Sequence, residues 1–405
     1  MIMMPADHPR EGKLREQTMR IMVVTDQYEP MVGGVPTVTR NLARGLAGRG
    51  HDVALVVPSP GWRGRLATAE QVSVTYRGSL RWPWYEGMRL GCLPASAAGK
   101  LMASFAPDVA HIHSPVTLGV MARIGAARRS VPVVYTNHYL PANIRPSAAP
   151  RSAIADAFFY RYIVGFSNKC SYVTAPTATA LGLLRERGLR VPSRVISNGA
   201  DLHEYSPGPA DGQIRHRYGL PAGRPLILSA GRLSPEKRMD VLLDAAARLS
   251  PDTQIAIAGT GPDEARLRAQ AQRLGLAGKV RFLGFVPGSD LPAIYRLADV
   301  FAIVSEAELQ SLTTMEAMAT GLPVVAVDAY ALGELVRHEE NGFLARPGQA
   351  AEVAAYLDLL CREPGLRARM SAASLRIISN HERLRLLAEW EFLYRTLAPT
   401  VPAER

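Results

Sequence analysis

Two cations in the second half of the chain have the type and spacing of a group that could hold a phosphate. Arg232 and Lys237 lie five residues apart, after an apolar run that leads to Gly231. An arginine can grip phosphate oxygens with two parallel hydrogen bonds, and a lysine supplies a compact charge. The two could be solvated surface cations, but their place at the end of a predicted strand favours neutralisation of a departing diphosphate.

Two carboxylates, Glu308 and Glu316, stand eight residues apart around a segment that predicts a helix beginning near Ser311. Glu308 would lie at the helix mouth, where it can accept hydrogen bonds from sugar hydroxyls. The backbone N–H groups of Ser311 and Leu312 would be free to face a phosphate or sugar oxygen. Glu316 falls among apolar residues, and a buried carboxylate needs a partner. Ribose hydroxyls could serve, and so could an arginine in a purely structural pair.

Glycine-bearing loops follow several other predicted strands. Glycine before a helix lets the backbone approach a ligand, and the free N–H groups attract phosphate. Each loop could be only a tight turn, but four of them favour a ligand site. No Gly-x-Gly-x-x-Gly fingerprint is present, which disfavours a dehydrogenase. The candidate positions in these loops are Gly33, Gly34, Gly231, Gly259, Phe285 and Val286.

His138 follows the predicted strand at 131–135 and could meet a reacting sugar across a cleft between two domains. A lone histidine is more often structural, and that alternative stays open. For His111 and His113, one strand earlier, we expect structural roles.

Strand and helix patterns alternate along the chain and restart after residue 200, which predicts two α/β blocks in series. Such alternation implies parallel strands with helical crossovers, the doubly wound class, with ligands at the carboxyl ends of the strands. The expected strands are 20–25, 51–57, 109–113, 131–135, 225–230, 254–258, 280–283, 300–303 and 324–327. The expected helices include 37–48, 239–249 and 263–274.

A chain of 405 residues exceeds what one core usually serves, so two domains are expected. We predict a flexible leader over 1–18, without the apolar stretch of a signal peptide. A first domain over 19–200 would be joined by a returning C-terminal helix over 382–400. A second domain would span 201–381, entered through a linker over 198–223 that is rich in Gly, Pro and Asp.

The positive charge is concentrated in the first half of the chain. Residues 1–200 hold 24 Lys or Arg and 11 Asp or Glu, a net charge of +13, whereas residues 201–405 carry −2. The basic half could attract an anionic acceptor, donor phosphates or an anionic membrane, or could simply aid solubility. The cations are dispersed and no recognition motif is present, so no nucleic acid is expected. Cys92, Cys170 and Cys361 are too far apart for a metal cluster and predict free thiols.

Together these segments resemble the family 4 retaining glycosyltransferases of the GT-B fold, from about residue 19 to about residue 395. Glu308 and Glu316 match the family's E-x7-E pair, and residues 231–237 match its diphosphate-binding loop. Residues 198–201, Asn-Gly-Ala-Asp, are similar to the family's N-G-V-D segment at the domain crossing. The resemblance implies two Rossmann-like domains that face each other across a cleft.

The resemblance also implies roles. Glu316 would hold the nucleotide ribose, Glu308 would contact the transferred sugar, and Arg232 and Lys237 would neutralise the diphosphate. Anomeric configuration would be retained by same-face attack, with the leaving phosphate taking the acceptor proton. Because the transition state separates charge between sugar and phosphate, the two cations would stabilise it more than the ground state.

Further roles are implied for the first domain and for the base. Gly34 would close over the diphosphate, the backbone of Phe285 and Val286 would read the base, and His138 would lie near the sugar's C6 hydroxyl. No metal and no cofactor are expected. The remaining positions expected to bind the donor are Gly33, Gly231, Gly259, Gln310, Ser311, Leu312 and Thr313.

The chain departs from the family pattern at two places. Gln310 and Ser311 stand where many relatives have Phe-Gly, and the segment 309–319 is similar to that of some glycolipid-forming members. Arg238 replaces the usual glycine after the loop lysine. Because of these departures, the resemblance does not specify which sugar is transferred, but they do not affect the expected fold.

We therefore predict a cytoplasmic hexosyltransferase that uses a UDP- or GDP-sugar and a lipid or membrane-peripheral acceptor. The alternative is a natural-product or small-molecule enzyme with a soluble polar acceptor. Residues 153–166, with Phe158, could contact the inner membrane face or could be core. A sugar-phosphate isomerase is disfavoured by the Glu308–Glu316 spacing, and an inactive binding protein would bind donor without turnover. The sequence leaves the oligomeric state open.

Overall fold

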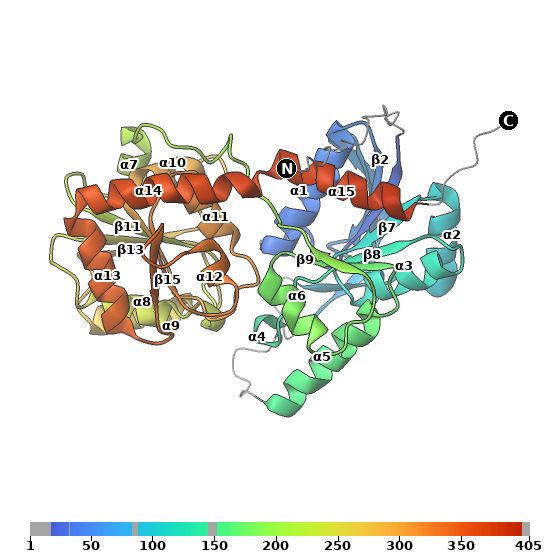
Figure 1. Ribbon diagram of the computed structural model, residues 1–405, viewed down its shortest axis with the longest axis horizontal. Helices are drawn as coiled ribbons and strands as arrows, with labels where there is room; N and C mark the ends of the chain where they lie inside the picture. Colours follow the sequence, from blue (N-terminus) through green and yellow to red (C-terminus); the bar gives the residue numbers. More distant parts are fainter. Residues whose placement is uncertain (1–17, 32, 83–87, 145–151, 399–405) are drawn as a thin grey trace, which may run out of the picture.

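The computed structural model describes residues 18–31, 33–82, 88–144 and 152–398, which form two α/β domains arranged along the long axis of the molecule (Figure 1). Each domain is built around its own twisted sheet with helices on both faces. The central strands of each sheet are short apolar runs buried on both sides, as parallel sheets require. The predicted GT-B class is thereby confirmed at the level of architecture.

The first domain contains an eight-stranded sheet in the order β10-β9-β8-β7-β1-β2-β4-β3, parallel except for the β3–β4 hairpin. Its strands are β1 (Arg20–Val24), β2 (Asp52–Pro58), β3 (Arg65–Ala69), β4 (Val72–Arg77), β7 (Val109–Ile112), β8 (Val133–Thr136), β9 (Tyr172–Ala175) and β10 (Ser193–Val195). A separate ribbon pairs β5 (Ser79–Arg81) with β6 (Arg89–Gly91). The helices are α1 (Gly34–Gly48), α2 (Ala95–Phe105), α3 (Thr117–Ala127), α4 (Pro141–Ile144), α5 (Ala153–Ser167) and α6 (Ala178–Arg185).

The second domain contains a six-stranded parallel sheet in the order β13-β12-β11-β14-β15-β16, which is the doubly wound order 3-2-1-4-5-6. Its strands are β11 (Leu226–Ala230), β12 (Gln254–Ala258), β13 (Val280–Gly284), β14 (Val300–Ile303), β15 (Val324–Val327) and β16 (Gly342–Ala345). The helices are α7 (Gly212–Arg217), α8 (Met239–Ala246), α9 (Glu264–Arg273), α10 (Leu291–Leu297), α11 (Leu312–Ala319), α12 (Leu332–Leu335), α13 (Ala350–Arg362) and α14 (Pro364–Ile378), with 3-10 turns at Pro235–Lys237 and Ser379–His381.

Each sheet has one point at which the strand order reverses. It lies between β1 and β7 in the first domain and between β11 and β14 in the second. Helices on either side of such a point diverge, so a crevice opens at the carboxyl ends of the strands. The loops that carry Gly33, Gly231 and Glu308 all begin at strands flanking these two points.

The C-terminal segment returns to the first domain, as predicted. Helix α15 (Arg383–Leu397) continues the line of α14 and crosses from one domain to the other (Figure 1). Its residues Leu387, Trp390 and Tyr394 join the core of the first domain. The Tyr394 hydroxyl lies 2.7 Å from Nδ1 of buried His111, which gives that histidine the structural role expected for it.

The predicted strands are all present, with ends that differ by at most about two residues from the observed ones. The expected linker over 198–223 differs, because it folds into the second domain. It contains α7, and its residues Tyr205, Ile214 and Leu220 belong to the core of that domain. The predicted leader lies outside the described residues except for Thr18.

Candidate donor site

The loops after β11, β12 and β13 lie against one another at the carboxyl edge of the second sheet. The Gly231 amide donates to the carbonyl of Ala258 at 2.9 Å, and the Gly259 amide donates to Gly284 at 2.8 Å. A Cβ atom on Gly259 would stand 1.9 Å from the Gly231 carbonyl oxygen, and its φ of +134° also excludes other residues. Glycine is therefore required at position 259 for the loops after β11 and β12 to pack together and expose their backbone at the carboxyl edge of the sheet.

Lys237 and Glu308 meet at the strand-order reversal of this domain. Lys237 closes the 3-10 turn after β11, and its Nζ lies 2.5 Å from Oε1 of Glu308, in the loop after β14. Glu308 is only 7% exposed, so the lysine compensates a carboxylate that has little access to water. The structure thus brings together two of the predicted site residues. Arg232 lies in the same loop as Lys237 and is half-buried.

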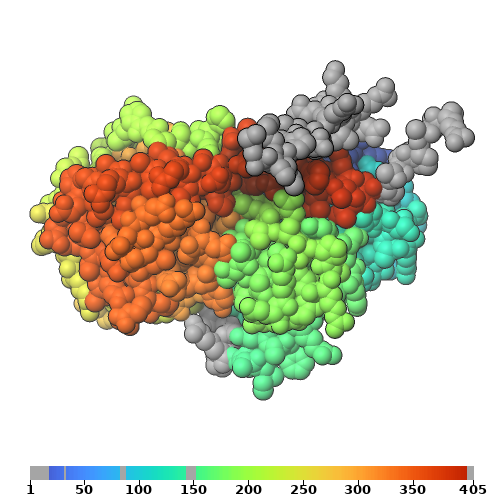
Figure 2. Space-filling view, viewed as in Figure 1, coloured from blue at the N-terminus to red at the C-terminus, as the bar shows by residue number. Residues whose placement is uncertain are grey.

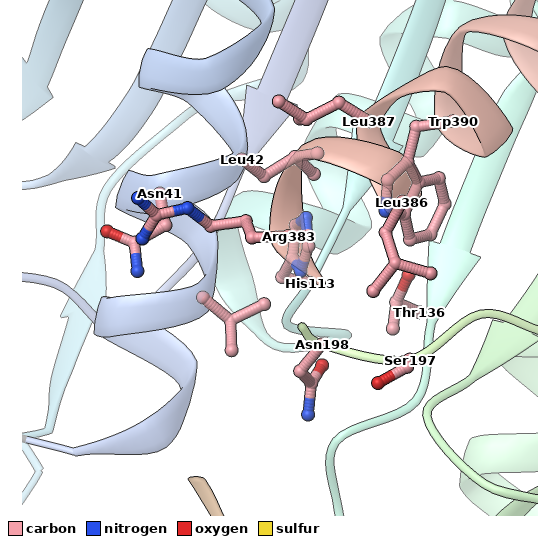
Figure 3. A pocket seen from close by; sticks show the side chains of 11 residues that line it. Asn41, Leu42, His113, Thr136, Ser197, Asn198, Arg383, Leu386, Leu387 and Trp390 are labelled. Atoms are coloured by element: carbon pink, nitrogen blue, oxygen red, sulfur yellow. The ribbon is translucent and has the colours of Figure 1, made fainter. Parts of the chain in front are cut away.

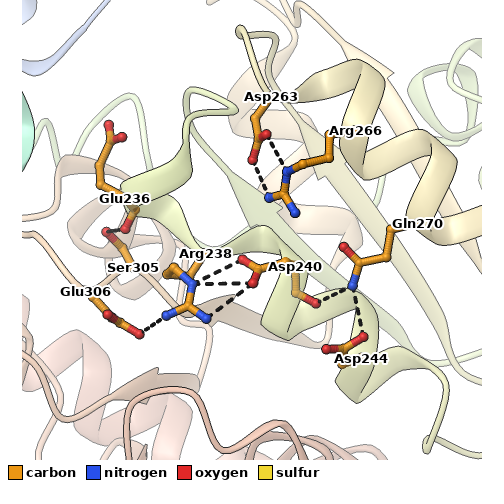
Figure 4. A network of polar contacts seen from close by, with 9 residues as sticks. All are labelled: Glu236, Arg238, Asp240, Asp244, Asp263, Arg266, Gln270, Ser305 and Glu306. Carbon is orange, nitrogen blue, oxygen red and sulfur yellow. Dashed lines mark hydrogen bonds and ion pairs between the residues drawn. The ribbon is translucent and has the colours of Figure 1, made fainter. Parts of the chain in front are cut away.

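Arg238 connects the loop after β11 to the loop after β14 (Figure 4). Its backbone is in the left-handed region, with φ +49°, which explains why glycine is usual at this position. Its guanidinium pairs with Asp240 at 3.2 Å and with Glu306. The Glu306 amide also donates to the Glu236 carbonyl at 3.1 Å. The ion pairs offset the cost of the backbone conformation and hold Lys237 opposite Glu308.

The N-termini of one helix from each domain, α1 and α11, lie close to each other. Ser311 caps α11 by accepting from the Thr314 amide at 3.2 Å, which leaves the N–H groups of Leu312 and Thr313 without helical acceptors. Gly34 is the first residue of α1, and a Cβ on it would stand 3.8 Å from Cδ1 of Leu312. An anion between the two helices would meet both positive ends.

Glu316 lies on α11 and is mostly buried, and its partners are tyrosine hydroxyls in place of the arginine of a structural pair. Tyr295 donates to Oε2 at 2.8 Å, and Tyr205 also hydrogen-bonds to the carboxylate. Desolvation by the surrounding side chains raises the pKa of Glu316 to about 7, although the tyrosine bonds oppose the shift. Phe285, at the end of β13, is 61% exposed, whereas Val286 is buried.

Gln310 points away from this edge and joins the two domains. Its Oε1 accepts from the Asn198 amide at 2.7 Å, and its Nε2 donates to Ser197 Oγ at 2.9 Å and to the Pro176 carbonyl at 3.2 Å. Beside it, Thr177 donates to the Leu309 carbonyl at 2.8 Å. The Gln310 side chain, predicted to contact substrate, is thus engaged at the domain crossing.

His138 belongs to a pair of histidines. Its Nε2 shares a 2.9 Å hydrogen bond with Nδ1 of His113, and the two rings stack with centroids 5.2 Å apart. Burial lowers the pKa of His138 to about 4, so the ring is neutral at pH 7. Leu140, two residues on, packs against Ala307 and Leu309 of the second domain. The His138 loop therefore lies next to the segment that carries Glu308.

A small cavity lies at the domain crossing between α1 and α15 (Figure 3). His113, Asn198 and Arg383 line it, and Arg383 pairs with Asp201 at 2.5 Å. Nε2 of His113 is buried there and has no hydrogen-bond partner among the described residues.

The sequence did not reveal the hydrogen-bond partners of Glu316, Gln310 and His138, which lie far from them in the chain. These partners are Tyr205, Tyr295, Ser197, Pro176 and His113. A tyrosine on α10 carries no motif, and only the expectation that buried Glu316 needs a partner could have suggested one.

Within the part of the chain that the structure describes, no three His, Cys, Asp or Glu residues come together as a metal site. No helix among these residues has the length and apolar character needed to cross a bilayer. Cys92, Cys170 and Cys361 are free thiols, as expected.

Two doubly wound domains that face each other, with glycine-bearing loops where their strand orders reverse, have the architecture of the GT-B class of glycosyltransferases. Residues 32–204 match the model for glycosyltransferase family 4, and residues 211–376 match that for glycosyl transferases group 1. The chain is 32% identical over 377 residues to a D-inositol 3-phosphate glycosyltransferase of Thermomonospora curvata, covering 85% of this chain and 86% of the relative. It belongs to glycosyltransferase family 4, whose members are retaining enzymes.

Another relative agrees with the family, and solved structures agree with the fold. The chain is 27% identical over 333 residues to an alpha-monoglucosyldiacylglycerol synthase of Streptococcus pneumoniae, covering 80% of this chain and 75% of the relative. A sucrose-phosphate synthase of Thermosynechococcus elongatus superposes with a TM-score of 0.78 at 20% identity, over 93% of this chain and 98% of that one. The Anabaena protein HepE, in complex with UDP and glucose, superposes with a TM-score of 0.75 at 23% identity, over 93% and 99%.

Proposed function

We propose that this enzyme transfers a hexose-type sugar, with retention, from a UDP- or GDP-sugar bound between Lys237 and Glu308 on one side and Gly34 on the other. The observation that carries the proposal is the Lys237–Glu308 pair at the reversal of strand order, in the segment that leads to the N-terminus of α11, which lies beside Gly34 of α1. The cation and the two helix ends supply positive potential for a diphosphate, and the carboxylate supplies an acceptor for sugar hydroxyls.

In the proposed reaction the bond from the anomeric carbon to the diphosphate breaks as the acceptor hydroxyl attacks from the same face. The electron pair stays on the leaving phosphate oxygen, which then takes the proton of the acceptor. Arg232 and Lys237 neutralise the negative charge that develops there. Because Arg232 and Lys237 neutralise this charge, we propose that transfer needs no metal. Activity should therefore survive treatment with a chelator.

The proposed role of Glu316 is to accept the ribose hydroxyls. A carboxylate with two tyrosine partners keeps lone pairs for further donors, so Glu316 can accept additional hydrogen bonds. The backbone after β13, at Phe285 and Val286, would read the base. His138, neutral at pH 7, would donate or accept a hydrogen bond beside the sugar without adding charge.

For the acceptor we propose a lipid or membrane-peripheral molecule, reached from the cytoplasmic face. The basic first half and the likeness to a glycolipid synthase favour it. A soluble polar acceptor is the second candidate, favoured by the 32% identity to a D-inositol 3-phosphate glycosyltransferase.

A thermal-shift screen with UDP and GDP tests the donor. A nucleotide that binds only the folded chain raises its melting temperature, by an amount that grows with ligand concentration. Stabilisation by one nucleotide, lost in Glu316→Ala, is the expected result. If neither nucleotide stabilises the chain, or Glu316→Ala responds fully, the proposed site is wrong.

A further inference from the structure

We propose that the exposed face of α5, with the groove between α5 and α3, docks this protein on an anionic phospholipid bilayer. The docking face consists of Arg123, Ile154, Phe158, Arg161, Tyr162 and Lys169. This docking rests on the lipid or membrane-peripheral acceptor of the proposed function and identifies the surface that would contact the membrane. The residues of that surface lie outside the donor site.

The first observation is a row of large apolar side chains directed at solvent. Ile154, Phe158 and Tyr162 stand four residues apart, on one side of α5, and are 72%, 68% and 51% exposed. The opposite side of the same helix carries Tyr160 and Ile163, which are buried in the domain. Helix α5 therefore has more apolar surface than its own fold can cover, which marks an interaction surface.

The second observation is a groove beneath this row. It has a volume of about 420 Å³ and runs between Val120 and Arg123 of α3 and Phe158 and Phe166 of α5. Nε of Arg123 is buried, with no hydrogen-bond partner among the described residues. A buried guanidinium N–H without an acceptor is costly, and a phosphate oxygen would supply the acceptor.

The third observation is charge. Arg161 on α5 and Lys169, two residues beyond its end, are exposed and line the groove, and Arg123 of α3 lines it as well. The only carboxylate on α5 is Asp156, in its first turn. Apolar side chains beside a cluster of cations match the interface of a bilayer with anionic headgroups. The same cations would repel a second copy of this face, which argues against a homodimer there.

The fourth observation is position. Helix α5 projects at the lower edge of the first domain (Figure 2). The Tyr162 hydroxyl donates to the Pro115 carbonyl, just beyond the carboxyl end of β7. The docking face therefore lies near the carboxyl end of β7 in the first sheet. A bilayer on this face would present a lipid acceptor to that edge.

Co-sedimentation with vesicles tests the proposal with the full chain. One set is phosphatidylcholine alone, and the other contains phosphatidylglycerol in addition. We expect binding to the anionic set and little to the neutral one. Neutralising two cations in Arg161→Gln/Lys169→Gln should weaken binding roughly 30-fold, because each basic side chain near such a surface contributes about a factor of five.

An apolar variant and matched controls separate the contributions. Ile154→Ser/Phe158→Ser should weaken binding to anionic vesicles about tenfold or more, since it removes apolar area from the interface. Phe392→Ser changes a residue that is 65% exposed on α15, and Arg248→Gln changes an exposed cation of the second domain. Both controls should bind as the parent does. All these positions are exposed, so the fold should be retained, which circular dichroism checks.

Several outcomes would overturn the proposal. One is the absence of binding to anionic vesicles, and another is equal binding by the parent and both double variants. If Ile154→Ser/Phe158→Ser changes the oligomeric state in size-exclusion chromatography and not vesicle binding, the face is an interface between protein chains. The donor site is assessed separately by nucleotide thermal shift, so vesicle binding can fail while the proposed transfer stands, and the reverse.

Discussion

The ammonium group of Lys237 lies 2.5 Å from a carboxylate oxygen of Glu308, although 71 residues separate them in the chain. Each side chain therefore sets the position and the charge balance of the other. A diphosphate would compete with Glu308 for Lys237, and the released carboxylate could then accept a hydrogen bond from a sugar hydroxyl. On the proposed function, the pair would couple recognition of the diphosphate to recognition of the sugar.

The first prediction concerns this pair. Lys237→Ala should lower kcat by about 100- to 1,000-fold, because it removes a cation aimed at charge that develops in the transition state. It should also lower the free energy of unfolding by about 2 kcal/mol, since Glu308 is left buried without its partner. Steady-state kinetics and urea unfolding measure the two effects.

A double variant separates stability from catalysis at this site. Lys237→Ala/Glu308→Gln removes the unpaired charge, so stability should recover while activity stays low. Near-parental turnover in Lys237→Ala would remove the lysine from the mechanism. Failure of the double variant to regain stability would show that the loss arises elsewhere than in the pair.

The second prediction concerns the contact between the domains at Gln310. Gln310→Leu keeps the size of the side chain but removes its bonds to Asn198, Ser197 and Pro176. Stability should fall by about 1–3 kcal/mol, because the partners stay buried without an acceptor or donor. Small-angle scattering should show a larger radius of gyration if this contact holds the domains together.

Gln310→Glu tests the same contact differently, since it keeps an acceptor for the Asn198 amide, loses the donor and adds a charge at a buried position. At pH 7 it should be no more stable than Gln310→Leu, because desolvation of a carboxylate costs more than loss of these hydrogen bonds. Unchanged stability and dimensions in Gln310→Leu, with altered kinetics for the donor, would instead place the side chain at the sugar, as its position in the motif first indicated.

The architecture could be predicted where strands are apolar on both faces. Residues 254–258 were predicted as a strand and form β12 with the same ends, because their side chains are all buried. Strand β3 (Arg65–Ala69) could not be predicted, because it lies at the sheet edge with mostly exposed residues and so carries no apolar run. The linker prediction at 198–223 was wrong because Gly and Pro are also frequent around short helices such as α7.

The site was predictable to the level of loops and not to the level of contacts. Parallel strands place their carboxyl ends on one edge, so Arg232 and Glu308 could be expected at the same edge from the strand pattern alone. The partners of Glu316 and Gln310 depend on how helices and domains pack over large sequence separations. No local spacing encodes such contacts, so Tyr295 and Ser197 had to come from the structure.

The third prediction concerns the left-handed backbone at Arg238. Arg238→Gly and Arg238→Ala both lose the ion pairs to Glu306 and Asp240, but only alanine keeps the cost of a positive φ. The glycine variant should therefore be about 1 kcal/mol more stable than the alanine variant. Thermal and urea unfolding compare the two, and equal stabilities would mean that this backbone relaxes when the side chain is removed.

The fourth prediction concerns the pH dependence of stability at Glu316. Burial raises its pKa in the folded chain to about 7, above the ordinary value of 4.5. Between these two values the folded chain binds more protons than the unfolded chain, so this group makes stability fall as pH rises through that window. Glu316→Gln should remove this fall in urea unfolding at pH 5 to 7.5, and a parental slope in the variant would contradict the raised pKa.

Protonation of Glu316 should also affect nucleotide binding, but in the opposite direction: affinity should rise with pH where stability falls. Ribose hydroxyls donate to the ionised carboxylate, so affinity for UDP or GDP should rise about tenfold as pH passes upward through about 7. Calorimetry across this range should show the rise in the parent and a flat, weaker profile in Glu316→Gln. Tyr295→Phe keeps the carboxylate but removes one bond that favours its charge, so its midpoint should move to higher pH. A parental profile in Glu316→Gln would place the ribose elsewhere.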